Sequence, residues 1–212
     1  MERNELKFIL SLTQAEILQE RLKAVLKPDP NTPEGDYMVR SLYFDTPDHR
    51  FFQENLAGVG KRVKYRLRMY NGNESLIRLE RKEREYNISR KSGRVVSEKE
   101  ALPFMEGASP VPELPELKPV CICEYTRRAY VFPISHVRIT FDKNICASHE
   151  CKKFLSGDFF RIPVSVPGEV IMEIKFDEIL PEFILNIIQI GSLRQTSYSK
   201  FVNCCREIWA NN

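Results

Sequence analysis

Short segments in which polar and apolar residues alternate recur along the chain and predict β-strands. The clearest is KRVKYRLRMY at 61–70, where Lys64, Arg66 and Arg68 alternate with apolar residues. Successive side chains of a strand point to opposite faces, so the three cations share one face. The same rhythm of charge recurs in the segments 76–82, 138–142 and 173–175. The pattern predicts an antiparallel sheet with one charged and one apolar face.

Outside the alternating segments, the pattern of polar and apolar residues predicts helices near the two ends of a mostly β chain. Thr13 and Glu16 form a capping-box pattern that predicts the start of a helix reaching about residue 27. Asn71-Gly72-Asn73 predicts a hairpin turn. Further strands are expected at 3–10, 39–45, 62–70, 75–84, 85–96, 120–131, 137–142 and 169–176. An irregular crossover is expected at the proline-rich 102–119, and helices at about 181–190 and 199–210. This order favours a closed barrel with charge inside and helices outside.

Positive residues outnumber negative residues on the predicted polar face. A solvated face normally mixes both signs, and each strand taken alone fits that ordinary interpretation. Positions that share the face by parity are Lys7, Lys64, Arg66, Arg68, Arg78, Lys82, Arg127, Arg138 and Lys175, against Glu5, Glu80 and Glu173. Because the whole chain is only +3, cations are concentrated there. We expect a dense anion as ligand; nucleic acid is not expected, because the aromatic residues form no stacking platform on that face.

Length and composition fit one ordinary globular core. The chain has 212 residues, of which 42% are hydrophobic, and we expect a single domain over 1–212. Charges interrupt the first apolar stretch and no run of eighteen apolar residues follows, so no signal peptide and no membrane segment are expected. The six cysteines match no zinc spacing and are expected to be reduced thiols in a cytoplasmic protein.

Eight motifs in a fixed order carry a resemblance to a known family. They are RNELKF (3–8), SLYFDT (41–46), YRLRMY (65–70), LERKER (79–84), YTRRAY (125–130), VRITFD (137–142), MEIKF (172–176) and SYSKF (197–201). Together they resemble the VTC domain, the polyphosphate polymerase domain of the vacuolar transporter chaperone complex. That domain is a member of the triphosphate tunnel metalloenzyme superfamily, related to CYTH proteins. The resemblance implies a mainly β (α+β) fold: an eight-stranded antiparallel β-barrel tunnel with flanking helices, lined by basic residues.

The resemblance also implies roles for individual residues. Phosphate-binding residues of the family match Lys7, Arg66, Arg68, Lys82, Arg127, Arg138 and Lys200, with Lys91 a looser match, and parity adds Lys175. Arg66, Arg68, Lys82 and Lys200 are expected to act directly on the reacting phosphates, because Arg forks and Lys point charges suit phosphate oxygens. Glu173 matches the metal-binding glutamate. Parity makes Glu5 a second candidate ligand and Glu80 a weaker one. Which of Arg90, Lys91 and Arg94 shares the charged face stays open.

The function that this resemblance implies is polyphosphate synthesis. The γ-phosphate of ATP would be transferred to a growing chain with Mn²⁺ or Mg²⁺, so ATP or another triphosphate and polyphosphate or pyrophosphate are the expected partners. Phosphoryl transfer needs positioning and charge stabilisation but no covalent nucleophile. Two alternatives stay open: a tunnel triphosphatase that hydrolyses tripolyphosphate or a nucleoside triphosphate, and a non-catalytic polyphosphate-binding module. The sequence does not report whether water or a phosphate chain is the acceptor.

Overall fold

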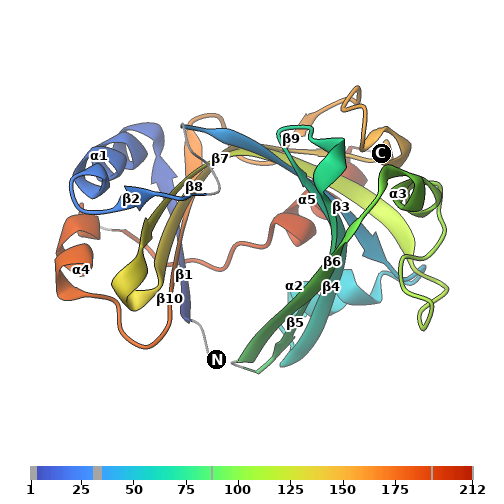
Figure 1. Ribbon diagram of the computed structural model, residues 1–212, viewed down its shortest axis with the longest axis horizontal. Helices are drawn as coiled ribbons and strands as arrows, with labels where there is room; N and C mark the ends of the chain where they lie inside the picture. The colour runs from blue at the N-terminus through green and yellow to red at the C-terminus, as the bar shows by residue number, and fades with distance from the viewer. Residues whose placement is uncertain (1–3, 31–34, 87, 192, 212) are drawn as a thin grey trace. The chain divides into compact units, whose positions relative to one another are not determined.

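The computed structural model describes residues 4–30, 35–86, 88–191 and 193–211. The chain divides into two compact units (Figure 1). Unit 1 comprises Met1–Tyr37, Thr126–Asn144 and Ser165–Tyr198, and unit 2 comprises Met38–Tyr125, Ile145–Val164 and Ser199–Asn212. Two long strands, β7 (Lys118–Phe132) and β8 (Val137–Ser148), each contribute residues to both units. The expectation of one domain over 1–212 stays a prediction.

Unit 1 is a small antiparallel sheet with helices packed on its apolar face. Its elements are β1 (Asn4–Ser11), α1 (Leu12–Lys23), β2 (Lys27–Pro28), β10 (Glu169–Phe176), α4 (Glu182–Ile188), and parts of β7 and β8, with a 3₁₀ turn at Pro133–Ser135. Strand β10 lies between β1 and β8, and β2 pairs with β7. Phe8, Met172 and Phe141 occupy one row of this register, so the alternation in the three strands places their apolar residues on the same face.

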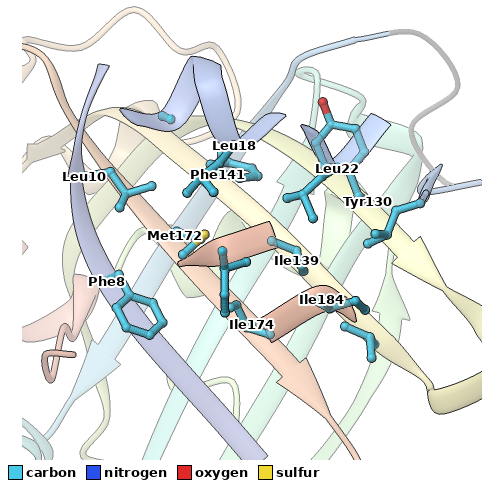
Figure 2. Packing of buried hydrophobic residues seen from close by; sticks show 14 of the residues in the cluster. Phe8, Leu10, Leu18, Leu22, Tyr130, Ile139, Phe141, Met172, Ile174 and Ile184 are labelled. Atoms are coloured by element: carbon cyan, nitrogen blue, oxygen red, sulfur yellow. The ribbon is translucent and has the colours of Figure 1, made fainter. Parts of the chain in front are cut away.

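The core of unit 1 lies between that apolar face and the helices (Figure 2). Leu18 and Leu22 of α1 and Ile184 of α4 are fully buried against it. Each such side chain contributes about 2 kcal/mol by leaving water. The opposite face of the same three strands carries the predicted polar residues.

Helix α1 begins two residues earlier than the sequence predicts. Ser11 is the N-cap: its Oγ accepts a hydrogen bond from the Gln14 backbone N–H (3.2 Å), and Gln14 Oε1 accepts one from the Ser11 N–H (2.9 Å). The predicted capping box at Thr13 and Glu16 is therefore wrong, because strand β1 passes into the helix without a connecting loop. The helix ends at Lys23, since the chain then extends to pair with β7.

Unit 2 contains the longer meander. Its elements are β3 (Tyr37–Asp45), α2 (Arg50–Ala57), β4 (Lys61–Tyr70), β5 (Ile77–Glu85), β6 (Ile88–Val96), α3 (Glu98–Met105), β9 (Ile162–Pro163), α5 (Lys200–Ala210), parts of β7 and β8, and 3₁₀ turns at Glu74–Leu76 and Cys151–Lys153. Antiparallel ladders join β3 to β4, β4 to β5 and β5 to β6. The predicted hairpin turn is confirmed, with positive φ at Asn71 (50°) and Gly72 (67°).

Two helices of unit 2 were not predicted. Helix α2 begins after β3 because the Asp45 carboxylate accepts the backbone N–H groups of Phe51 (2.8 Å) and Phe52 (2.9 Å). Helix α3 begins at a capping box formed by Ser97 and Glu100, before the region where prolines predicted an irregular crossover. Both starts depend on a side chain that caps backbone N–H groups, and a hydrophobic period does not reveal this over eight residues.

The mainly β, antiparallel fold class is confirmed. In the described residues eight longer strands hydrogen-bond in the order β1-β10-β8-β7-β3-β4-β5-β6, and the two-residue strands β2 and β9 lie off this path. The order has two ends, so the ring of hydrogen bonds expected of a closed barrel is not seen. Strand β6, at one end, is exposed over most of its length and carries Arg90, Lys91 and Arg94, charges typical of an unpaired edge. Within the described parts of the chain, every helix is too short or too polar to span a bilayer.

Candidate functional site

The polar face of unit 1 carries carboxylates and cations on neighbouring strands in register. Glu5, Lys175 and Arg138 occupy one row across β1, β10 and β8, and Lys7 and Glu173 share the next row. Lys7 Nζ lies 2.7 Å from Glu5 Oε1 and 3.9 Å from Glu173 Oε2, and donates to the Tyr198 carbonyl (3.0 Å). Glu173 also forms an ion pair with Lys175. The two predicted metal-binding carboxylates are thus brought together with two predicted phosphate-binding lysines.

Two arginines of unit 1 are held by buried aspartates. Arg127 donates from Nε and Nη2 to the two carboxylate oxygens of Asp142, at 2.6 and 2.7 Å. Arg138 donates from Nε to Asp29 Oδ2 (2.7 Å) and from Nη2 to the Tyr37 hydroxyl (3.2 Å). Both aspartates are buried, so these ion pairs fix the guanidinium groups firmly.

In unit 2 a buried glutamate is the centre of a cationic group. Glu80 lies on β5, and its Oε2 accepts from Arg66 Nε (2.8 Å) and lies 2.7 Å from Arg66 Nη2. Arg68 Nη1 is 3.8 Å from the same oxygen, and Lys91 Nζ is 2.6 Å from Oε1. Arg78 Nε is 4.0 Å away. We call Glu80 with Arg66, Arg68, Arg78 and Lys91 the Glu80 cluster.

Hydroxyl groups of β3 complete the positioning of the two central arginines. Arg66 Nη1 donates to the Tyr43 hydroxyl (3.2 Å) and Arg68 Nε to Ser41 Oγ (3.2 Å). Tyr43 pairs with Arg66, and Ser41 with Arg68, in the β3–β4 register. These contacts follow directly from the register of the two strands.

Glu80 and Arg66 are both charged at neutral pH. Burial alone would raise the pKa of Glu80, but the charges of Arg66, Arg68 and Lys91 outweigh it and lower that pKa to about 2. Burial likewise disfavours the charge of Arg66, yet Tyr43 and Glu80 raise its pKa overall. Burial raises the pKa of Tyr43 to about 12, so its hydroxyl stays neutral. In unit 1, burial lowers the pKa of Lys175, and Glu173 and Glu5 oppose that effect only in part.

The remaining predicted cations of unit 2 lie on β5 and at the start of α5. Lys82 stands opposite Lys64 and Lys91 in the sheet register. Lys64 Nζ donates to the Oγ of Ser199 (2.9 Å), the N-cap of α5. Lys200, the first helical residue, places its Nζ 4.7 Å from the centre of the Tyr125 ring. A helix start with neighbouring lysines is an environment that favours anions.

The structure thus divides the predicted site residues between the units. Unit 1 holds Lys7, Arg127, Arg138, Lys175, Glu5 and Glu173, and unit 2 holds Arg66, Arg68, Lys82, Lys91 and Lys200. Of the three candidates on β6, Lys91 contacts Glu80, whereas Arg90 pairs with Glu85 (3.9 Å) and Arg94 with Glu100 (2.8 Å). Their roles in binding phosphate stay predictions.

Sequence reasoning missed several residues that hold the cations. Asp29, Tyr37, Ser41, Tyr43 and Asp142 each bind a predicted phosphate-binding arginine. Parity places Asp142 on the face of Arg138, and this signal could have identified it. Asp29 lies outside the strands, so no periodic signal marks it.

The carboxylates of unit 1 fit a divalent cation that takes further ligands from a substrate. Glu173 and Glu5 lie on adjacent strands near Lys7. Within the described residues no group of three or more His, Cys, Asp or Glu side chains could hold a metal. Mg²⁺ is typically bound by one or two carboxylates with substrate phosphates and waters, so two glutamates suffice as the protein's share.

Fold and charge together define an antiparallel β protein with arginines and lysines gathered on the polar faces of its sheet. The sequence model of the VTC domain matches residues 2–114 and 111–208. The chain belongs to the VTC domain family. No curated protein matches the chain.

Solved structures share the fold over nearly the whole chain at low sequence identity. A protein from Pyrococcus horikoshii is 14% identical with a TM-score of 0.54, covering 99% of this chain and 98% of that one. A candidate adenylyl cyclase from Hippeastrum with a dominant triphosphatase activity is 16% identical with a TM-score of 0.51, covering 89% and 85%. A chain of the Schizosaccharomyces pombe Mediator head module is 9% identical with a TM-score of 0.51, covering 89% and 90%. These likenesses show the fold, and the fold alone does not decide an activity.

Proposed function

We propose that this protein is a polyphosphate polymerase that transfers the γ-phosphate of ATP to a growing phosphate chain. Membership of the VTC domain family over nearly the whole chain is the observation that supports this most. The second support is chemical: the family-matched arginines are each held in a defined orientation by a hydrogen bond from Nε.

In this proposal the arginines bind and align the phosphates. Arg66 and Arg68 present guanidinium N–H groups that grip phosphate oxygens, and Lys82 and Lys200 add point charges. Arg127, Arg138, Lys7 and Lys175 bind phosphate in unit 1. Because Glu80 is ionised and Tyr43 neutral, the Glu80 cluster keeps a net positive charge throughout the physiological pH range. Stabilising charge on the transferred group is the main task in phosphoryl transfer.

Glu173, with Glu5 as a second ligand, is the proposed holder of a divalent cation, Mn²⁺ or Mg²⁺. When bound, such an ion neutralises phosphate charge and orients the reacting groups. Lys7 forms an ion pair with Glu5 and Lys175 forms one with Glu173, and these contacts hold the two carboxylates in place for that role.

We also propose that the protein works in the cytoplasm. The six cysteines, all of them among the described residues, form no disulfide. Burial raises the pKa of the Cys121 and Cys204 thiols well above the ordinary value and that of Cys146 to about 12, so these thiols are poorly reactive. Cysteines that form no disulfide are typical of a reducing compartment.

Hydrolysis is the second candidate. The Hippeastrum protein with the same fold has a dominant triphosphatase activity. The same cations would bind tripolyphosphate or a nucleoside triphosphate while water attacks. A non-catalytic polyphosphate-binding module would use the cations for affinity alone.

A timed assay separates these candidates. The purified protein is incubated with ATP and Mn²⁺ or Mg²⁺, with and without pyrophosphate as a primer, and ADP, free phosphate and phosphate chains are resolved on one gel. Chains that lengthen in step with ADP support the polymerase, and free phosphate alone supports the triphosphatase. Tight polyphosphate binding without turnover supports the binding module. Protein carrying Arg66→Ala, prepared identically, controls for contaminating enzymes.

A further inference from the structure

The predicted phosphate-binding arginines share one arrangement: each donates its Nε–H to an acceptor within its own unit. The acceptors are Glu80 for Arg66 (2.8 Å), Asp142 for Arg127 (2.6 Å), Asp29 for Arg138 (2.7 Å) and Ser41 for Arg68 (3.2 Å). Three of the four acceptors are carboxylates, and all three are at least 97% buried. The arrangement is thus common to both units and to strands that are far apart in the sequence.

The arrangement has a chemical consequence for how a ligand is gripped. A guanidinium group has five N–H donors and offers two edges for bidentate binding, one formed by Nε with Nη2 and one by the two Nη atoms. In Arg66 and Arg127 the carboxylate occupies the first edge, because Nε and Nη2 both lie 2.6–2.8 Å from its oxygens. An incoming phosphate therefore meets these arginines from the Nη side.

We infer that Glu80, Asp142 and Asp29 are positioning residues, which fix the planes of Arg66, Arg127 and Arg138 so that their Nη atoms receive phosphate in one geometry. This inference rests on the proposed function. The carboxylates do not touch the phosphate themselves. They act by limiting each long side chain to one orientation, so less rotamer freedom is lost when the anion binds.

The backbone around Glu80 is adapted to this role. Gly93 of β6 is the register partner of Glu80. A Cβ at residue 93 would lie 2.6 Å from the Leu79 carbonyl oxygen and 3.3 Å from the Glu80 Cα, so β6 approaches β5 closely only because this residue is glycine. Lys91, two residues earlier, thereby reaches Glu80 Oε1 from the same strand. Tyr43 fixes Arg66 from its other side.

Affinity alone does not explain carboxylates at these positions. A negative charge beside an anion site opposes binding of the anion. A surface built only to attract polyphosphate would omit them, whereas a site that must align phosphates gains from rigid arginines. If the carboxylates position the arginines, removing one of them should therefore not weaken anion binding but should lower turnover.

Isosteric amide variants test the inference. In Glu80→Gln and Asp142→Asn the negative charge is removed while size and one acceptor oxygen remain. For each variant we would measure the dissociation constant for tripolyphosphate without metal or nucleotide, kcat and KM in the assay above, and the thermal unfolding temperature. We expect the dissociation constant to be equal or lower and kcat to fall by about 100-fold, as when reacting groups are misplaced.

Glu124→Gln is the matched control. Glu124 is a buried carboxylate that accepts from Arg40 Nε at 2.6 Å, the same type of pair, and Arg40 is not among the predicted phosphate-binding residues. We expect it to lower the unfolding temperature but to leave kcat and the dissociation constant unchanged. If Glu80→Gln and Asp142→Asn merely repeat the control, or if affinity and kcat fall together, the carboxylates are structural and the inference is overturned.

A readout without turnover keeps this inference distinguishable from the proposed function. If the wild-type protein converts no nucleotide, the polymerase proposal fails. The inference about the carboxylates is then tested by the ratio of the dissociation constants for sulfate and tripolyphosphate, compared between the wild type and the amide variants. Fixed arginines should select the longer anion, so the amide variants should lose part of that preference. An unchanged ratio would overturn the inference even though polyphosphate still binds.

Discussion

Arg66 and Glu80 are register partners across β4 and β5, and Arg66 Nη2 lies 2.7 Å from Glu80 Oε2. Both side chains are largely withdrawn from water, with 15% and 1% of their surfaces exposed. The pair therefore contributes both to the stability of the sheet and to the proposed phosphate site. A change on either side should alter both, and the two effects are separable by experiment.

A double-mutant cycle measures the coupling of this pair. Arg66→Ala leaves Glu80 buried with fewer cations, and we expect the free energy of unfolding to fall by about 3 kcal/mol. Combining it with Glu80→Ala should recover part of the loss, with a coupling energy of about 2 kcal/mol. Urea unfolding of the two single variants and the double variant provides the values. Simple additivity of the two single changes would show that the ion pair is unimportant.

The pH dependence of stability should carry the signature of Glu80. Its pKa is lowered from 4.5 to about 2, so its contribution to stability is present above pH 4.5 and is lost as the pH falls toward 2. The lowered pKa corresponds to about 3 kcal/mol at neutral pH. We expect the difference in unfolding free energy between wild type and Glu80→Gln to shrink between pH 5 and pH 2.5. A difference that is constant over this range would contradict the assigned pKa.

Gly93→Ala should disturb the junction of β5 and β6. The added Cβ would lie 2.6 Å from a backbone oxygen that has no freedom to move away alone. We expect a loss of about 2 kcal/mol in unfolding free energy, as for other overpacked sites. Gly60→Ala is the control, because its Cβ would meet only the exposed Tyr86 ring at 2.9 Å, which can rotate away. Equal losses in the two variants would argue against a special role for Gly93.

Glu173→Gln should separate metal-dependent turnover from anion binding. Removing this carboxylate removes the proposed main protein ligand of the cation, while Lys7 and Lys175 remain to bind phosphate. We expect kcat to fall by about 100-fold, with a much smaller change in the dissociation constant for tripolyphosphate measured without metal. Higher Mn²⁺ concentration should restore part of the activity. If affinity and turnover fell equally and metal had no effect, Glu173 would be structural.

Much of the charged surface could be predicted from the sequence, because strand side chains alternate with a period of two residues. Parity placed Arg66 and Glu80 on one face of unit 2, and Lys7 and Glu173 on one face of unit 1, as the register confirms. Parity gives no information on which side chains meet. The count of charges showed more cations than carboxylates on that face, but it could not show that Glu80 is buried beside Arg66.

Other parts of the fold left no periodic signal. Helix α2 depends on Asp45 as a cap for the N–H groups of Phe51 and Phe52, a contact between residues six and seven positions apart. Asp29 reaches Arg138 from a segment outside the strands. Both the alternating strand pattern and the family resemblance favoured a closed ring of strands, whereas β6 ends the hydrogen-bonded order in the described residues.

The most direct test of this account is a crystal structure of the protein with tripolyphosphate bound. In unit 2 we predict phosphate oxygens within hydrogen-bond distance of the Nη atoms of Arg66, while its Nε remains on Glu80. In unit 1 we predict the same for Arg127 and Asp142. Tripolyphosphate bound away from these arginines, or bound only after the carboxylates have been displaced from Nε, would contradict the account.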